Sequence, residues 1–239
     1  MSYGKLGRLA PKPLHSPDFT HYLQVPLPTP PVEIAAPDLV YPMAANDKLG
    51  DCTIAAVVHA DQVWSSEVGT QYTYPGDEDV EGEYFTLSGG QDSGLVEANV
   101  LAKWKSQGLF GNKIWGFAPV APKHTNSVKS VVENYGIAYT GIMIPAIAQE
   151  QFASGQPWAL TNTQADYNIV GGHAVPIVGY NPNGPIIVTW GKLQQLTWQW
   201  WLTYADECWV ILPHEYIEAG KGPKLDLKAL EDELTRIGA

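Results

Sequence analysis

The chain changes its hydrophobic period part-way along, and this change limits the folds that it can adopt. Segments before about residue 136 repeat apolar side chains at helical spacing. Later segments are short, β-branched and aromatic, with Gly, Pro and Asn between them. Helices followed by strands, without βαβ alternation, argue against a doubly wound parallel sheet. The sequence therefore predicts an α+β fold.

The helices and strands can be placed by their start and stop signals. An apolar helix is expected from Cys52 to about Gly69. A second helix is expected after Ser93, as its N-cap, and the acidic segment 73–84 is expected to be a solvated loop. The remaining expected elements are a helix over 127–136, strands over 137–144, 173–180, 185–190 and 207–213, and a last helix over 225–238 capped by Asp226.

Nine of the nineteen prolines lie in the first 42 residues. Proline lacks a backbone donor and disfavours helix, so residues 1–42 are expected to form an extended arm, packed on its own domain or on a partner. The domain that follows is expected to span 43–220. Its parts are a helical lobe of roughly 43–135 and a β lobe of roughly 136–220. Residues 221–239 are expected to form a helix that packs on the domain or on a neighbour.

Composition narrows the class of protein further. The net charge of −11, without any basic stretch, argues against nucleic acid as a partner. No apolar run approaches the length of a membrane span or of a signal-peptide core. We therefore expect a protein of the cytoplasm or of a virion, with its two cysteines reduced. Homo-oligomers are compatible with this composition.

Cys52, in NDKLGDC, begins an apolar helix, and it is either a small core residue or a nucleophile at a helix N-terminus. A nucleophilic thiol needs a base, which is most often histidine. His59 lies seven residues along the same helix, about 10 Å away at 1.5 Å per residue, which excludes it. His173 follows two glycines at the start of the GGHAVPIVGY strand, and it is the candidate base.

Together, NDKLGDC, HAVPIVGY and VTWG resemble the active-site segments of papain-like cysteine peptidases, over about residues 26–212. The GDCT, GGHAV and VTWG segments also resemble an uncharacterised branch of that family in actinobacteria and their phages. The resemblance implies a helical lobe and an antiparallel β-barrel-like lobe, with Cys52 as the nucleophile between them. The family's tryptophan and disulfide next to the nucleophile are missing here, since LGDCTI replaces them.

The resemblance also implies roles for other residues. His173 would be the base, and Asn46 would supply the oxyanion amide although it is one methylene shorter than the usual glutamine. Thr189 stands where the family has the orienting asparagine, and its hydroxyl can accept an imidazole N–H. The positions that would border the substrate are Trp190, which would shield the pair, Gly89 and Gly90 of the glycine-rich loop, and Gly172.

Two function hypotheses follow. The first is a cysteine peptidase or amidase that acts on a peptide or protein, with neither a metal nor an organic cofactor. The second is a weak or silent papain-like module, such as a phage capsid or tail component, whose proline-rich arm lies on neighbouring virion subunits. A weaker variant of the first transfers the acyl group to an amine.

Three other features have competing interpretations. Cys208 lies in a strand-like run and is expected to be an inert buried thiol. The aromatic segment 197–201 is either core or a stacking platform for a ligand. Asp206 and Glu207 are candidates for acid–base chemistry, although a position on the rim or a structural ion pair is the simpler interpretation.

Overall fold

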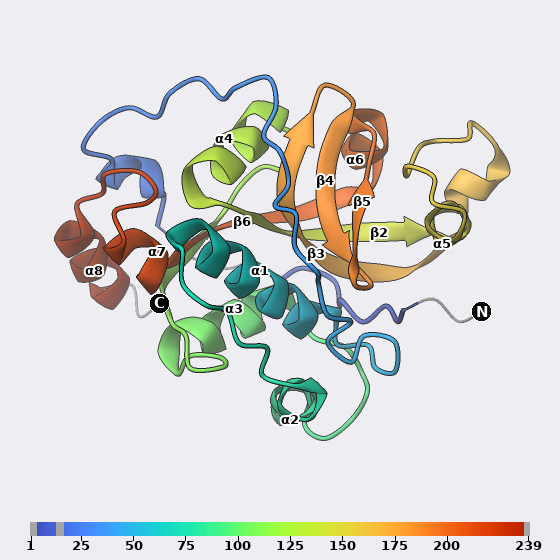
Figure 1. The fold of residues 1–239 in the computed structure, drawn as a ribbon, viewed down its shortest axis with the longest axis horizontal. Helices are drawn as coiled ribbons and strands as arrows, with labels where there is room; N and C mark the ends of the chain where they lie inside the picture. Colours follow the sequence, from blue (N-terminus) through green and yellow to red (C-terminus); the bar gives the residue numbers. More distant parts are fainter. Residues whose placement is uncertain (1–3, 13–16, 237–239) are drawn as a thin grey trace.

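The computed structural model describes residues 4–12 and 17–236 and shows an α+β fold (Figure 1). Residues 1–3, 13–16 and 237–239, which belong to the predicted arm and last helix, lie outside the described residues. The helices are η1 (Phe19–Tyr22), α1 (Cys52–Val68), α2 (Asp77–Ser88), α3 (Glu97–Ser106), α4 (Thr125–Tyr135), α5 (Ala146–Ala153), η2 (Gln164–Tyr167), α6 (Trp198–Tyr204), α7 (His214–Glu218) and α8 (Leu227–Arg236). The strands are β1 (Ile114–Pro119), β2 (Ala138–Pro145), β3 (Ile169–Asn181), β4 (Gly184–Thr189), β5 (Lys192–Gln195) and β6 (Ala205–Pro213).

The six strands form one antiparallel sheet in the order β1-β6-β2-β3-β4-β5. Its edge strands, β1 and β5, do not pair with each other in the described part of the chain, so the sheet is open rather than a closed barrel. The sheet begins with β1, inside the segment expected to form the helical lobe, and β1 pairs with β6. Long strand β3 therefore lies well inside the sheet, with β2 and β4 on its two sides.

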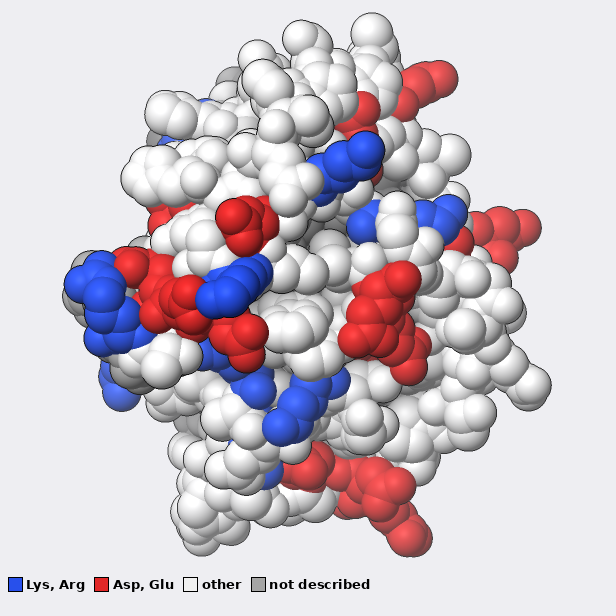
Figure 2. Space-filling view, turned by 90° about the vertical axis from the view of Figure 1, so that its left-hand side faces the viewer, with Lys and Arg blue, Asp and Glu red and all other residues white. Residues whose placement is uncertain are grey.

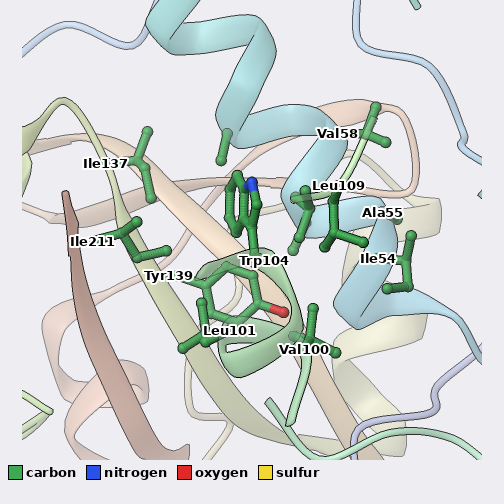
Figure 3. Close-up of a cluster of buried hydrophobic side chains, with 14 of the residues drawn as sticks. Ile54, Ala55, Val58, Val100, Leu101, Trp104, Leu109, Ile137, Tyr139 and Ile211 are labelled. Atoms are coloured by element: carbon green, nitrogen blue, oxygen red, sulfur yellow. The ribbon is translucent and has the colours of Figure 1, made fainter. Parts of the chain in front are cut away.

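Helix α1 packs against β3 and is buried on most of its sides, as its apolar sequence predicts. It ends at Gly69, which adopts the left-handed conformation (φ 75°) that a helix C-cap requires. Side chains of α1 and α3 meet those of β2 and β6 in one core cluster (Figure 3). Within it, the Tyr139 hydroxyl donates to the Thr53 carbonyl at 2.7 Å, which ties β2 to the first turn of α1.

The expectation that the acidic segment 73–84 forms a loop is wrong in part, because helix α2 begins within it at Asp77. Three acidic residues occupy its first turn, where the helix dipole stabilises negative charge, and Val80 and Tyr84 are buried. Helix α3 begins at Glu97 rather than after Ser93. The reason is a tight loop before it, where the Tyr84 hydroxyl donates to Asp92 at 2.7 Å and accepts from the Gly94 N–H at 2.9 Å.

The proline-rich arm packs on its own domain. Residues 4–12 run between the sheet and the helices α1 to α3 (Figure 1, dark blue). Farther along, the arm crosses the domain with single bridges from Leu23 to Leu225 and from Ile34 to Tyr180. The last helix, α8, lies beside η1 with Leu230 and Leu234 buried, and Asp226 accepts from the Ala229 N–H as the predicted cap.

Basic side chains on the face shown in Figure 2 lie among acidic ones. Within residues 4–12 and 17–236, no helix combines the length and the hydropathy that a bilayer span needs.

Candidate active site

Cys52 is the first residue of α1, and its side chain is 1% exposed. Its Sγ accepts a hydrogen bond from the backbone N–H of Ala174, at 3.4 Å, so it lies beside the residue that follows His173. The fold thus brings Cys52 and His173, 121 positions apart in the sequence, to the same place. The N-terminus of α1 favours a negative charge on the thiol sulfur.

His173 lies in β3 and is held by the strand next to it. Its Nε2 is 2.7 Å from the Thr189 hydroxyl, in the last residue of β4, and both residues are buried. Its Nδ1 is buried and has no hydrogen-bond partner in the described residues. The Trp190 ring packs over the imidazole, with centroids 5.0 Å apart. Thr189 therefore contacts the ring through one nitrogen, and the other nitrogen stays without a partner among the described residues.

The Asn46 side chain lies six residues before Cys52 and is also buried. Its Nδ2 donates to the Lys5 carbonyl at 3.3 Å, to the Leu49 carbonyl at 3.1 Å and to the Asp51 carboxylate at 3.0 Å. Asn46 thus already holds the carbonyl of a peptide unit that belongs to the arm.

The arm crosses the site as an extended peptide. The Arg8 N–H donates to the Gly172 carbonyl at 3.1 Å, on the residue before His173. On its other side, Leu95 donates to the Gly7 carbonyl at 2.9 Å and accepts from the Leu9 N–H at 2.8 Å. The Gly7 backbone N–H also lies close enough to the Cys52 thiol to lower its pKa. The arm therefore covers the nucleophile.

The arm packs closely against the walls of the site at three glycines. A Cβ built on Gly7 would lie 1.7 Å from the Gly50 carbonyl oxygen, and one on Gly172 would lie 2.5 Å from the Arg8 carbonyl oxygen. On the opposite wall stands Gly94 (φ 76°), where a side chain would meet the Gly7 carbonyl. The arm fits only because these positions lack side chains.

The structure changes one part of the predicted substrate-binding set. Gly89 and Gly90 lie at the C-terminus of α2, where a Cβ would have no neighbour within 4 Å, so they do not border the arm. Gly94 and Leu95, in the same loop, border it instead. Gly94 lies in the SGL segment just before α3. The sequence of this segment predicts the start of a helix, not a wall of the cleft. Gly172 and Trp190, the other two residues predicted to border a substrate, lie against the arm.

Burial controls the charges of the pair in this arrangement. Desolvation raises the pKa of the Cys52 thiol to about 12, against smaller opposing effects of the Ala174 and Gly7 N–H groups. Desolvation also lowers the pKa of His173 to about 3, and the positive charge of Arg8 adds to this effect. With the arm in place, the pair is therefore a neutral thiol and a neutral imidazole at pH 7.

Other candidate groups are located away from the thiol chemistry. Cys208 is buried in β6, as expected. His59 is buried in α1 with its Nε2 2.9 Å from the Pro42 carbonyl. Trp200 and Trp201 are fully buried, so these two residues of the 197–201 segment belong to the core. Among the described residues, no group of three or more His, Cys, Asp or Glu is arranged to hold a metal ion.

Comparison with solved structures identifies the architecture. The chain matches xylellain, a cysteine protease from Xylella fastidiosa, with a TM-score of 0.63 and 14% sequence identity over 88% of this chain and 97% of that one. The fold is papain-like. No family model and no curated protein matches the sequence. At 14% identity the likeness concerns the fold, so the chemistry depends on the geometry of Cys52, His173, Thr189 and Asn46.

Proposed function

We propose that this protein is a thiol peptidase whose own arm keeps it latent. The observation that carries this proposal is the extended peptide of residues 5–9, which lies across Cys52 with backbone hydrogen bonds on both sides. A cleft that binds one extended peptide through backbone groups has the shape and the donors to bind another. The likeness of the fold to that of a cysteine protease supports the same conclusion.

In the open state, the Cys52 S–H proton passes to Nδ1 of His173, and the thiolate attacks the substrate carbonyl carbon. The Asn46 amide stabilises the oxyanion. The C–N bond then breaks, and the amine leaves with the proton from His173. Water next attacks the thioester, with His173 as the base, and releases the acid and the thiol. Thr189 accepts a hydrogen bond from Nε2–H throughout and keeps the ring in the required tautomer.

Removal of the arm favours the charged pair in two ways. It exposes Cys52 and His173 to water, which reverses the desolvation that raises the thiol pKa and lowers the imidazole pKa. It also withdraws the Arg8 guanidinium, whose charge opposes a proton on His173. The arm thus suppresses the transfer of a proton from Cys52 to His173 as well as the access of a substrate to Cys52.

The test compares hydrolysis of a mixture of unstructured peptides by Gly7→Ala, in which the arm is displaced, and by Gly7→Ala/Cys52→Ala. We expect cleavage by the first protein only, together with a thioester adduct on Cys52 when the reaction is quenched in acid. If Gly7→Ala takes up alkylating agent at Cys52 but cleaves no peptide and forms no adduct, the protein is instead a silent module of the same fold.

A further inference from the structure

The arm places one charged side chain inside the molecule, and that side chain is Arg8. Its side chain is only 1% exposed. Nη1 donates to Glu207 at 2.9 Å, and Nη2 donates to both oxygens of Asp206 at 2.7 Å. Nε lies 4.0 Å from Glu97, at the start of α3. One cation thus faces three carboxyl groups.

This pocket is formed by the domain, not by the arm. Asp206 and Glu207 come from β6, Glu97 comes from α3, and Trp209 donates to Glu97 at 3.0 Å. Gly141 of β2 provides the space, since a Cβ there would lie 2.6 Å from Nη1 of Arg8 and 2.8 Å from Oε1 of Glu97. The three carboxyl groups would therefore stay in place after the arm leaves, without the Arg8 cation between them.

The pocket has acceptors that Arg8 does not use. Oε1 of Glu97 and Oε1 of Glu207 are buried and have no hydrogen-bond partner in the described residues. Burial, together with the Glu207 charge, raises the pKa of Glu97 well above its usual range, which shows how unfavourable further negative charge is here. An empty pocket would hold buried carboxyl groups that either repel one another or take up protons, so a cation that enters it removes a free-energy cost.

The position of the pocket relative to the thiol fits a substrate subsite. Arg8 is bound through its backbone between Gly172 and Leu95, directly next to Gly7, whose N–H contacts Cys52. A substrate residue held by the same backbone groups would lie one position from the residue at the thiol. Its side chain would enter the same acidic pocket.

We propose that Glu97, Asp206 and Glu207 form a specificity pocket for a basic side chain, so that the peptidase selects peptides with arginine one residue from the residue whose carbonyl group Cys52 attacks. The inference rests on the proposed function. Arginine fits better than lysine because its two terminal nitrogens bind different carboxylates at the same time, Nη2 to Asp206 and Nη1 to Glu207, whereas an ammonium group is a single point of charge. In the latent state, Arg8 fills the pocket in place of the substrate.

The experiment uses full-length Gly7→Ala and four peptide substrates that differ only in that residue, which is Arg, Lys, Leu or Glu. We expect kcat/KM to decrease in that order, with Arg favoured over Leu by at least about tenfold, the scale of a charge-assisted hydrogen bond. Glu207→Gln, added to Gly7→Ala, should remove most of the preference. Asp206→Asn, at a position that is partly exposed, provides a second variant if Glu207→Gln does not fold. Glu231→Gln, on exposed α8, is the matched control and should leave the preference intact.

Two outcomes separate this inference from the proposed function. Hydrolysis of the Leu and Arg peptides at equal rates would overturn the specificity pocket while the peptidase remains. If no peptide is cleaved, binding of fluorescent Arg and Leu peptides to Gly7→Ala/Cys52→Ala decides the question. Binding of the Arg peptide at least tenfold more tightly, lost in Glu207→Gln, supports the pocket without the peptidase, and equal binding overturns it.

Discussion

A single methyl group on Gly7 should open the site. The Cβ of Gly7→Ala would lie 1.7 Å from the Gly50 carbonyl oxygen, whereas ordinary contact begins near 3.4 Å. Because that oxygen belongs to backbone, the arm must move away by about the difference, 3.4 − 1.7 = 1.7 Å. Gly82→Ala is the matched control. Gly82 lies within α2, and a Cβ there has no neighbour within 4 Å.

A displacement of this size breaks the hydrogen bonds nearest to Gly7. These are Leu95 N–H to Gly7 at 2.9 Å, Arg8 N–H to Gly172 at 3.1 Å and Leu9 N–H to Leu95 at 2.8 Å. At about 1 kcal/mol net for each bond, the closed state loses about 3 kcal/mol relative to the open one. The population of open molecules should therefore increase roughly a hundredfold.

The assay is the rate of alkylation of each cysteine by iodoacetamide at pH 7, mapped by mass spectrometry. Cys208 serves as an internal control, because it is buried in β6 and should react only on unfolding. We expect the rate at Cys52 to increase about a hundredfold in Gly7→Ala and to stay unchanged in Gly82→Ala. The reasoning is refuted if Cys52 reacts at the same rate in both variants. An equal increase at Cys208 would also refute it, because that pattern indicates global unfolding.

Three further changes test the site and its surroundings. In the Gly7→Ala background, His173→Ala should abolish peptide hydrolysis while the thermal midpoint stays within a few degrees, and hydrolysis at the parent rate would exclude His173 as the base. Thr189→Val removes the hydroxyl that lies 2.7 Å from Nε2 of His173. Turnover should therefore fall roughly tenfold, and the free energy of unfolding, measured with urea, should fall by about 1–3 kcal/mol. An unchanged turnover would show that Thr189 does not orient the ring. Burial raises the pKa of Asp61 to about 7, so the folded state keeps a proton that the unfolded state releases near pH 4. This group therefore reduces stability as pH rises from about 4 to about 7, and Asp61→Asn should flatten that part of the stability profile; a steeper loss would contradict this assignment.

The positions of Cys52 and His173 could be predicted from sequence because each lies in a helix or strand with a clear hydrophobic pattern. An apolar helix that begins at Cys52 and a β-branched strand that contains His173 each place one group. The resemblance to a known family supplied their pairing and the positions of Thr189 and Asn46. Short-range pattern also predicted the C-cap at Gly69 and the N-cap at Asp226, because both depend on local geometry.

The arm and the acidic pocket could not be predicted, because both depend on long-range contacts. Arg8 lies 198 positions from Asp206 and 199 from Glu207, and nothing near it in the sequence marks it as buried. Glu97 looks like an ordinary acidic residue in the first turn of a helix, a position that is usually exposed. Helix α2 was missed because its glycine and charges resemble a loop, while its stability comes from Val80 and Tyr84, which are buried in the core.

The central claim is that Cys52 and His173 form a reactive pair once the arm leaves, and the pH dependence of Cys52 alkylation tests it most directly. The measurement compares Gly7→Ala with Gly7→Ala/His173→Ala between pH 5 and 10. A thiolate stabilised by an imidazolium should give Gly7→Ala a rate that is already on a plateau near pH 6, and the double variant a rate that rises only toward the pKa of an ordinary thiol, about 8.5. Superimposable profiles with a midpoint near 8.5 in both proteins would contradict the account.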